Sequence, residues 1–396
     1  MATTTSSPRI AIIGAGPSGL VLHLTLVKRG VPSTLYEREA SPNARIHLGG
    51  TLDLRWAYGQ RALYENGLEA AFKAVSRPEG DETRICGKDG RVLLELIGDR
   101  DIINPEDISP EVDRRALRQI ILDAVPADSV KWGHALTSVT PHGDGTHTLS
   151  FANGHTAVVD VLVGADGGTS RIRPLVSPAQ RYYAGITGAE LVIPPDVVDR
   201  ADMADARALV GAGTTYAMEG GNVLIGQRNS DGRVRTYAWF HGPEDWPLPA
   251  DPSEARAVLL EKFEGWAPVL RKLIEHGADD AIYHRPLYML EPGLRWEHVD
   301  GVTIIGDAAH VMTPFAGMGA NVSMLDGLEM GLAIAEAVNA GASKEEREAA
   351  IKKAEEKLFE EGAKWTAVTA TNMKGAIGPD APQCMVELYK LMKGIP

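Results

Sequence analysis

The sequence predicts an α/β fold in which a domain built on a parallel sheet is interrupted by a β-rich segment and followed by a C-terminal helix. Three observations predict it. Residues 9–38 give a strand, a glycine-rich turn, a helix and a second strand, which is how a parallel sheet begins. Residues 182–242 are strand-like pieces broken by glycine turns. Residues 300–310 then return to a buried strand of the parallel type.

The other elements have signals of their own. Residues 114–125 have the apolar spacing of an amphipathic helix, and Asn153-Gly154 marks a hairpin that ends in a buried strand. Residues 321–338 predict a second long helix. With 396 residues, the chain is long enough for this arrangement. We divide it into residues 1–175 and 291–342 as the two parts of the parallel-sheet domain, 176–290 as the β-rich domain and 343–396 as a C-terminal helical segment.

The C-terminal segment opens with a helix-start pattern. Ser343 and Glu346 have the spacing of a capping box, ahead of a helix rich in Glu and Lys. Glu348 and Lys352 lie one turn apart, and we expect both on the solvent face of that helix. The simplest interpretation of this helix is structural.

Composition and charge exclude several classes of function. The formal net charge is −13 without a compensating block of Lys and Arg, which argues against nucleic acid or an anionic membrane as partner. Cys86 and Cys384 are far apart, so we expect no disulfide and no cysteine-based metal site, and no other metal motif is present. The polar N-terminus and the lack of a run of about 18 apolar residues fit a cytoplasmic protein without a membrane span.

The first chemical motif is the turn Gly14–Gly19, with the sequence GAGPSG. In a dinucleotide fingerprint Gly14 permits the tight turn, Gly16 lets the backbone approach a pyrophosphate and Gly19 lets the helix pack on the strand. Free N–H groups at the helix start then face the phosphates. Glu37, at the end of the next strand, can accept hydrogen bonds from an adenosine ribose. This context predicts a Rossmann-like nucleotide-binding domain, and a glycine turn without a ligand is the alternative.

Two further motifs are weaker when each is taken alone. The segment VLVGADGGTSRIR contains Asp166, which with the following glycine is also an ordinary turn pair. The segment IGDAAHVMTPFAGMGAN places Asp307 where a strand ends and a helix begins, so its carboxylate can accept a hydrogen bond from a ribityl or ribose hydroxyl. Backbone N–H groups after Pro314 can meet a ring carbonyl or a phosphate at the next helix start.

In this order and with these separations, the three motifs resemble the FAD-dependent aromatic hydroxylases. These are the class A flavoprotein monooxygenases with the para-hydroxybenzoate hydroxylase fold, and the resemblance covers nearly the whole chain. Within it, the stretch YEREASPNARIHLGGTLDLR is similar to the tetracycline-inactivating FAD monooxygenases, the tetracycline destructases. The resemblance implies a GR2-type FAD-binding domain, FAD as cofactor and NADPH or NADH as co-substrate. Only one dinucleotide fingerprint is present, so a nicotinamide nucleotide would have no Rossmann-type binding site of its own.

The resemblance also assigns roles to residues. Asp307 would contact the ribityl chain of FAD, Arg114 would contact FAD from its helix, and Arg45 would belong to the phosphate contacts. Substrate candidates are Gly188, Arg235, Tyr237 and Phe315, for which half-buried packing positions are the equally simple alternative. The residues implied to bind the cofactor are Gly14, Gly16, Pro17, Ser18, Gly19, Glu37, Arg38, Arg45, Asp53, Arg114, Asp166, Asp307, Pro314, Gly317, Gly319, Ala320 and Asn321.

The implied activity is hydroxylation. In the family NAD(P)H reduces FAD, the reduced flavin and O₂ form a C4a-hydroperoxide, and one oxygen atom passes to an aromatic or polyketide-like small molecule, tetracyclines included. The β-rich domain would cover the flavin and choose the substrate. No acid–base side chain is obligatory for oxygen transfer, so we assign no catalytic residue, and His310 fits a structural role better than that of a base.

Three further expectations complete the interpretation. We expect a monomer or a weak dimer. A flavin-dependent dehydrogenase or reductase of the same fold, without oxygen insertion, is the alternative enzyme. A nucleotide-binding protein without activity is the alternative outside enzymes.

Overall fold

A five-stranded parallel sheet forms the centre of the first domain, in a computed structural model that describes residues 7–44, 49–97, 106 and 108–395. The strand order is β19-β11-β1-β2-β7, and every neighbouring pair is parallel. The predicted α/β fold is therefore confirmed, including the late return of the chain to the sheet. The strands are β1 (Ile10–Ile13), β2 (Thr34–Tyr36), β7 (Val130–Lys131), β11 (Val161–Gly164) and β19 (Val302–Ile304).

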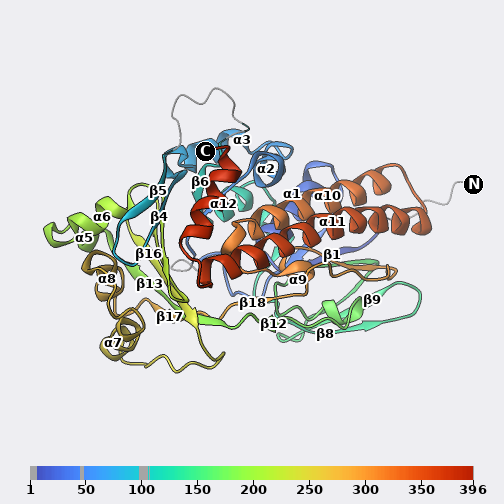
Figure 1. Ribbon diagram of the computed structural model, residues 1–396. Helices are drawn as coiled ribbons and strands as arrows, with labels where there is room; N and C mark the ends of the chain where they lie inside the picture. The colour runs from blue at the N-terminus through green and yellow to red at the C-terminus, as the bar shows by residue number, and fades with distance from the viewer. Residues whose placement is uncertain (1–6, 45–48, 98–105, 107, 396) are drawn as a thin grey trace, which may run out of the picture.

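Two helices far apart in the sequence pack closely beside this sheet. They are α1 (Pro17–Lys28), which follows the first strand, and α10 (Gly319–Asn339), which lies next to it (Figure 1). Glycines on α10 permit the approach, because a Cβ at Gly327 would lie 2.4 Å from the carbonyl oxygen of Ser18. The large apolar cluster of this domain includes residues of both helices and of the parallel sheet.

A seven-stranded sheet forms the second domain. It is antiparallel except where β14 pairs with β4. Residues 82–97 belong to this sheet, although they lie within the range 1–175 that we predicted for the first domain. The strands in spatial order are β17 (Ile282–His284), β13 (Ile186–Ile193), β16 (Val234–His241), β15 (Asn222–Arg228), β14 (Thr214–Glu219), β4 (Glu82–Cys86) and β5 (Val92–Ile97).

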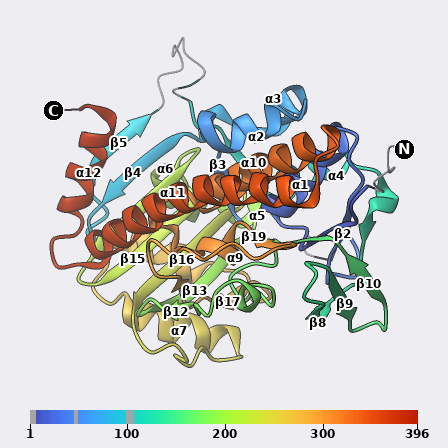
Figure 2. The same ribbon diagram turned by 90° about the vertical axis from the view of Figure 1, so that its right-hand side faces the viewer.

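Each face of the seven-stranded sheet is covered by a different set of helices (Figure 2). One apolar cluster joins the sheet to α6 (Ala204–Val210), α7 (Pro252–Lys262) and α8 (Pro268–Glu275). A separate cluster joins the other face to the end of α11 (Lys344–Ile377) and to α12 (Gln383–Lys393). The C-terminal helices therefore pack against the second domain as well as the first.

Shorter elements connect these layers. The predicted hairpin at Asn153-Gly154 is confirmed, since β9 pairs with β10 around it. The remaining strands are β3 (Thr51–Asp53), β6 (Glu111–Asp113), β8 (Leu136–Pro141), β9 (His147–Phe151), β10 (Thr156–Val159), β12 (Tyr182–Tyr183) and β18 (Tyr288–Met289). The remaining α-helices are α2 (Arg61–Tyr64), α3 (Glu69–Val75), α4 (Arg114–Leu122), α5 (Pro195–Val198) and α9 (Asp307–His310). Among the described residues, none of the helices has the length and apolarity needed to cross a membrane.

The start of α11 confirms one expectation and corrects another. Ser343 and Glu346 form the predicted capping box, with hydrogen bonds in both directions. The expectation that Glu348 lies on the solvent face is wrong, because its side chain is buried and accepts a hydrogen bond from the Gly301 N–H at 2.9 Å. The Glu348 carboxylate thus fastens α11 to the turn that precedes β19.

His298 lies between two carboxylates of α11. Its Nδ1 is 2.8 Å from Glu355 Oε2, and its Nε2 is 3.4 Å from Glu348 Oε2. Glu355 also accepts a hydrogen bond from the Thr303 hydroxyl of β19 at 2.7 Å. The hydrogen bonds to Glu348 and Glu355 raise the pKa of His298 to about 9. This cluster is a charged link between α11 and the edge of the parallel sheet.

We expect His298→Gln to lower the free energy of unfolding by about 3 kcal/mol, because breaking a buried ion pair leaves charge uncompensated. A histidine whose pKa is raised on folding stabilises most fully below its unfolded pKa of about 6.5. The difference between the wild type and the variant should therefore shrink as the pH rises through about 9. Urea unfolding from pH 6 to pH 10 measures it. Lys352→Gln, on the exposed face of α11, is the control and should change little.

Candidate functional site

One long cavity runs between the two domains. Its volume is about 1540 Å³, and it is lined by the starts of α1, α4, α9 and α10, by β3 and β6, and by one face of the seven-stranded sheet. Residues from the three sequence motifs and from the β-rich domain line it together. The insertion therefore places its sheet over the site rather than away from it.

The three glycines of the turn before α1 have different roles. Gly14 has φ +107°, and a Cβ there would lie 2.3 Å from the Ala165 carbonyl oxygen. A Cβ at Gly19 would lie 2.0 Å from the Gly14 carbonyl oxygen. A Cβ at Gly16 would meet no atom within 4 Å, and Gly16 lines the cavity. Gly14 and Gly19 are thus required by the fold, whereas Gly16 leaves space for a ligand.

The start of α1 presents backbone N–H groups that no side chain of the described residues caps. The N-cap residue is Gly16, which has no side chain to accept a hydrogen bond from the first N–H groups of the helix. Pro17 occupies the first turn. Pro17 and Ser18 line the cavity with Gly16. Uncapped N–H groups at the positive end of a helix are a binding site for an anion such as a phosphate.

Glu37 lies beside this helix start. Its carboxylate is buried and accepts hydrogen bonds from the N–H groups of Ala15 at 2.6 Å and Glu39 at 3.0 Å. Glu37 also lines the cavity, so the fixed carboxylate is positioned next to the glycine turn. Arg38 is exposed and does not line the cavity. Arg45 falls outside the described residues.

Helix α4 contributes three arginines to the lining of the cavity, Arg114, Arg115 and Arg118. Arg114, its first residue, packs against Gly49, where a Cβ would come within 2.9 Å of Arg114 Cδ. Arg118, one turn later, donates a hydrogen bond to the Pro42 carbonyl at 2.7 Å. Burial lowers the pKa of Arg118 from its usual value. The sequence reasoning missed Arg118, although its i+4 spacing from Arg114 puts both on one helix face.

The segment VLVGADGGTSRIR is hydrogen-bonded to the segment that begins with Gly306 and Asp307. Arg173 is buried and donates hydrogen bonds to the carbonyls of Ala308 at 2.7 Å and Gly168 at 2.8 Å. Asp166 accepts a hydrogen bond from the Arg171 N–H at 2.7 Å, and burial raises the pKa of Asp166. Asp166 does not line the cavity. These contacts connect the end of β11 to the start of α9.

Asp307 follows Gly306, which has φ +61°, and begins α9. Its side chain opens onto the cavity and its carboxylate accepts no hydrogen bond from any described residue. Protein atoms enclose it on the other sides, which raises the pKa of Asp307, while His310 and Arg114 act in the opposite direction. Asp307 is thus an acceptor that faces the cavity.

His310 has a partner within the fold. Its Nε2 lies 2.6 Å from Asp326 Oδ2, and the same oxygen accepts a hydrogen bond from the Gly306 N–H at 2.8 Å. Burial lowers the pKa of His310, but the Asp326 carboxylate outweighs this and raises it overall. Because His310 is buried and shares Asp326 with the Gly306 turn, its contacts favour the structural role.

The segment before α10 and the first residues of that helix also line the cavity. Pro314, Gly317, Gly319 and Ala320 all line it, and α10 begins without a side-chain cap. Asn321 does not line it. The Asn321 amide instead donates to the Asp53 carbonyl at 2.7 Å and accepts from the Arg55 N–H at 2.8 Å. Asn321 therefore holds β3 against the start of α10.

These features together fit FAD. The open space at Gly16, the uncapped start of α1 and the arginines of α4 suit a diphosphate. Glu37 and Asp307 offer carboxylates for sugar hydroxyls. The uncapped start of α10 offers N–H groups for the carbonyl edge of a flavin ring.

The seven-stranded sheet supplies a wall rich in aromatic side chains. Tyr237 and Trp239 stack at a centroid distance of 5.2 Å, and Phe315 lies 5.9 Å from Trp239. Residues on this wall that the sequence reasoning missed are Thr214, Tyr216, Met218, Val223, Ile225, Gln227, Asn372, Met385 and Tyr389. Asn372, Met385 and Tyr389 come from the C-terminal helices, which line the site as well as supporting the fold.

Two of the four substrate candidates do not line the cavity. Gly188 lies within β13, where a Cβ would come within 1.9 Å of the Ala238 carbonyl oxygen. Arg235 is buried on β16 and pairs with Glu190, which also accepts a hydrogen bond from Arg285 Nε at 2.8 Å. Tyr237 and Phe315 do line it.

Comparisons with known proteins agree on the family. A family model described as an FAD binding domain matches residues 8–356. The monooxygenase penA of Penicillium thymicola is 30% identical over 377 residues, covering 83% of this chain and 85% of that protein. The FAD-dependent urate hydroxylase of Mycolicibacterium vanbaalenii is 28% identical over 334 residues, covering 81% and 78%.

Solved structures show the same fold. HpxO from Klebsiella pneumoniae, complexed with FAD and uric acid, superimposes with a TM-score of 0.78 at 23% identity, covering 97% of this chain and 92% of that one. The tetracycline destructase Tet(51) gives a TM-score of 0.65 at 18% identity, covering 94% and 90%. At these identities the two structures support the fold alone.

Proposed function

The chain belongs to the family described as an FAD binding domain, and from this premise we propose that it is an NAD(P)H-consuming monooxygenase that hydroxylates an aromatic or polyketide-like molecule. The predicted family resemblance is thereby confirmed, and by their names one relative is a monooxygenase and another an FAD-dependent hydroxylase. The observation that carries the proposal is the single cavity that joins the FAD-fitting end to an aromatic wall.

The residues that line the cavity would bind the cofactor and position the substrate as follows. Backbone donors at the starts of α1 and α10 hold the two ends of the cofactor, and Asp307 binds its sugar chain. When bound, FAD supplies the reducing equivalents that activate O₂, with NADPH or NADH as their source. Tyr237, Trp239 and Phe315 orient a planar substrate and keep water from the reacting edge.

The aromatic wall also supports a ring-shaped substrate. Aromatic side chains contribute binding free energy to any planar ring that can stack on them or meet them edge to face, so the wall suits several ring systems. A urate hydroxylase among the relatives acts, by its name, on a flat heterocycle. Phenols, anthraquinones and tetracyclines form the first panel to test.

The test begins with the absorbance spectrum of the purified protein, which should show bound flavin. Substrate-dependent consumption of NADPH or NADH and O₂ should follow with at least one member of the panel. Mass spectrometry with ¹⁸O₂ should then place one labelled oxygen atom in the product. A reduced or dehydrogenated product without label would identify a flavin reductase or dehydrogenase of this fold. A colourless protein that takes up no added FAD would leave only a nucleotide-binding role.

A further inference from the structure

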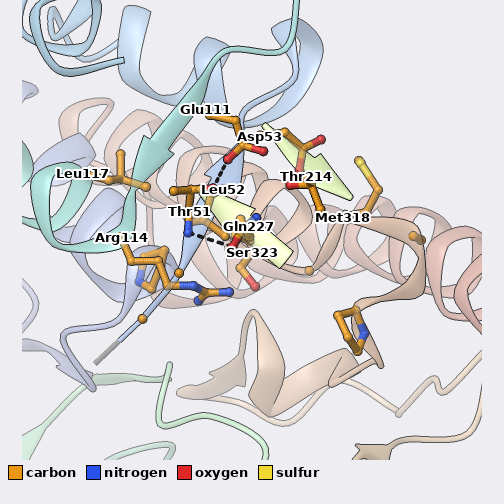
Figure 3. Close-up of a pocket in the computed structure, with 18 of the residues that line it drawn as sticks. Thr51, Leu52, Asp53, Glu111, Arg114, Leu117, Thr214, Gln227, Met318 and Ser323 are labelled. Carbon is orange, nitrogen blue, oxygen red and sulfur yellow. Dashed lines mark hydrogen bonds between the residues drawn. The ribbon is translucent and has the colours of Figure 1, made fainter. Parts of the chain in front are cut away.

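Two acidic side chains face each other across the short β3–β6 pair. Asp53 and Glu111 are directly opposite in register, and both line the cavity. Figure 3 shows their carboxyl groups close together on one side of the pair, near Thr214. Cross-strand partners of this kind have Cβ atoms about 5 Å apart, so the two carboxyl groups interact strongly.

The pair has few compensating charges. Glu111 is buried and accepts a hydrogen bond from the Thr51 hydroxyl, with the guanidinium of Arg77 more distant. Asp53 Oδ2 lies 3.7 Å from Arg55 Nε. Burial and the neighbouring Asp53 raise the pKa of Glu111 to about 8, and burial raises that of Asp53 to about 6. At neutral pH the pair therefore retains a proton that an exposed pair would lose.

The pair lies at the meeting point of the cofactor end and the aromatic wall. A Cβ at Gly317, in the segment before α10, would come within 3.3 Å of Asp53 Oδ1. On the other side, Tyr216 and Tyr389 of the wall interact electrostatically with Asp53. The wall also holds the Trp239 indole N–H, which is buried and has no hydrogen-bond partner among the described residues. Polar groups thus remain available where the ring of a substrate would meet the flavin.

We propose that Asp53 and Glu111 determine substrate specificity by hydrogen-bonding to a neutral hydroxyl or N–H group on the ring of the substrate and by excluding a carboxylate at that position. This deepens the function proposed above and rests on it. It also gives Asp53 a substrate-side role in place of the cofactor contact expected from the sequence.

The physical reason is the low polarity of the aromatic wall around the two carboxyl groups. A hydroxyl or N–H donor satisfies an acidic oxygen that would otherwise face apolar rings, and unpaired buried polar groups are costly. A carboxylate at the same place would meet the remaining negative charge of the pair at short range. Like charges at such distances cost at least about 1.4 kcal/mol, which is a tenfold loss of affinity.

Matched probes with one polar substituent test the proposal. We would titrate the FAD-loaded enzyme at pH 7 with 2-naphthol and 2-naphthoate, and with 4-phenylphenol and biphenyl-4-carboxylate, following the perturbation of the flavin spectrum. Each hydroxyl probe should bind at least about ten times more tightly than its carboxylate partner. In the Asp53→Asn/Glu111→Gln double variant, this preference should fall at least fivefold.

Controls separate specificity from folding. Glu95→Gln removes a half-exposed carboxylate that also lines the cavity and should leave the preference unchanged. FAD content and the melting temperature show whether each variant is folded. If the double variant does not fold, Asp53→Asn alone gives the same comparison at a residue that is 32% exposed.

Equal binding of both members of each pair in the wild type, an unchanged preference in the folded variants, or no binding of either hydroxyl probe would overturn the proposal. A wild type that holds FAD and oxidises NAD(P)H but shows no preference would overturn this inference alone. A protein that takes up no FAD would overturn the proposed function and this inference with it.

Discussion

Gly16→Ala is expected to give a folded protein that binds FAD about 100-fold more weakly than the wild type. A Cβ at this position meets no protein atom within 4 Å, so the fold has no reason to change. The methyl group instead occupies the space in which a diphosphate would approach the start of α1. Losing hydrogen bonds to a charged group costs about 3 kcal/mol, which corresponds to this factor. Flavin content after purification and titration of the apoprotein with FAD measure it.

Gly19→Ala is the matched comparison. Its Cβ would lie 2.0 Å from the Gly14 carbonyl oxygen, so α1 must move away from β1. We expect this variant to lower the melting temperature or the yield of folded protein, in contrast to Gly16→Ala. If Gly16→Ala keeps the wild-type affinity for FAD, the diphosphate does not lie at this turn.

Asp307→Ala should be the second large effect, with FAD binding weakened about 10- to 100-fold. The carboxylate accepts no hydrogen bond from any described residue, so its removal leaves no protein donor unpaired. The change should weaken the binding free energy of FAD rather than the stability of the protein, because a hydroxyl of the ligand loses a hydrogen bond to a charged acceptor, which contributes about 1.5–3 kcal/mol. Equilibrium dialysis of FAD against wild type and variant measures this, together with thermal unfolding of both apoproteins.

Asp326→Ala is the control for the same turn. Asp326 holds both the Gly306 N–H and His310, so its loss should destabilise the fold even without FAD. Asp307→Ala, in contrast, should leave the apoprotein as stable as the wild type or more so. An Asp307→Ala protein that purifies with full flavin occupancy would show that Asp307 is no ligand of the cofactor.

The sequence predicted the strand–turn–helix units of the first domain best because their signals are local. Gly14 and Gly306 both have positive φ, which favours glycine at those turns, and each turn joins a strand to a helix within a few residues. Glu37 could likewise be placed from the end of its strand. The return of residues 300–310 to the sheet was predictable because parallel strands buried on both faces are uniformly apolar.

The substrate end was harder to predict because its contacts are distant in sequence. Nothing local indicates that β4 pairs with β14 or that Tyr389 faces the cavity. Helical spacing likewise placed Glu348 on the solvent face, and the partners that bury it come from the loop before β19. Asp53 and Glu111 become a pair only through the register of β3 and β6. Such pairings depend on the whole fold rather than on a pattern of residue types.

The hydrogen bonds of Arg173 to the carbonyls of Ala308 and Gly168 have a consequence for synthesis of the protein. Because β19 and α9 follow the β-rich domain in the chain, a nascent polypeptide that has completed only the glycine turn and β11 carries half of a binding site. That half gains its counterpart only after the intervening domain has been made. Translation therefore finishes the seven-stranded sheet that lines the cavity before α9 and α10, which line it from the other domain, have been made.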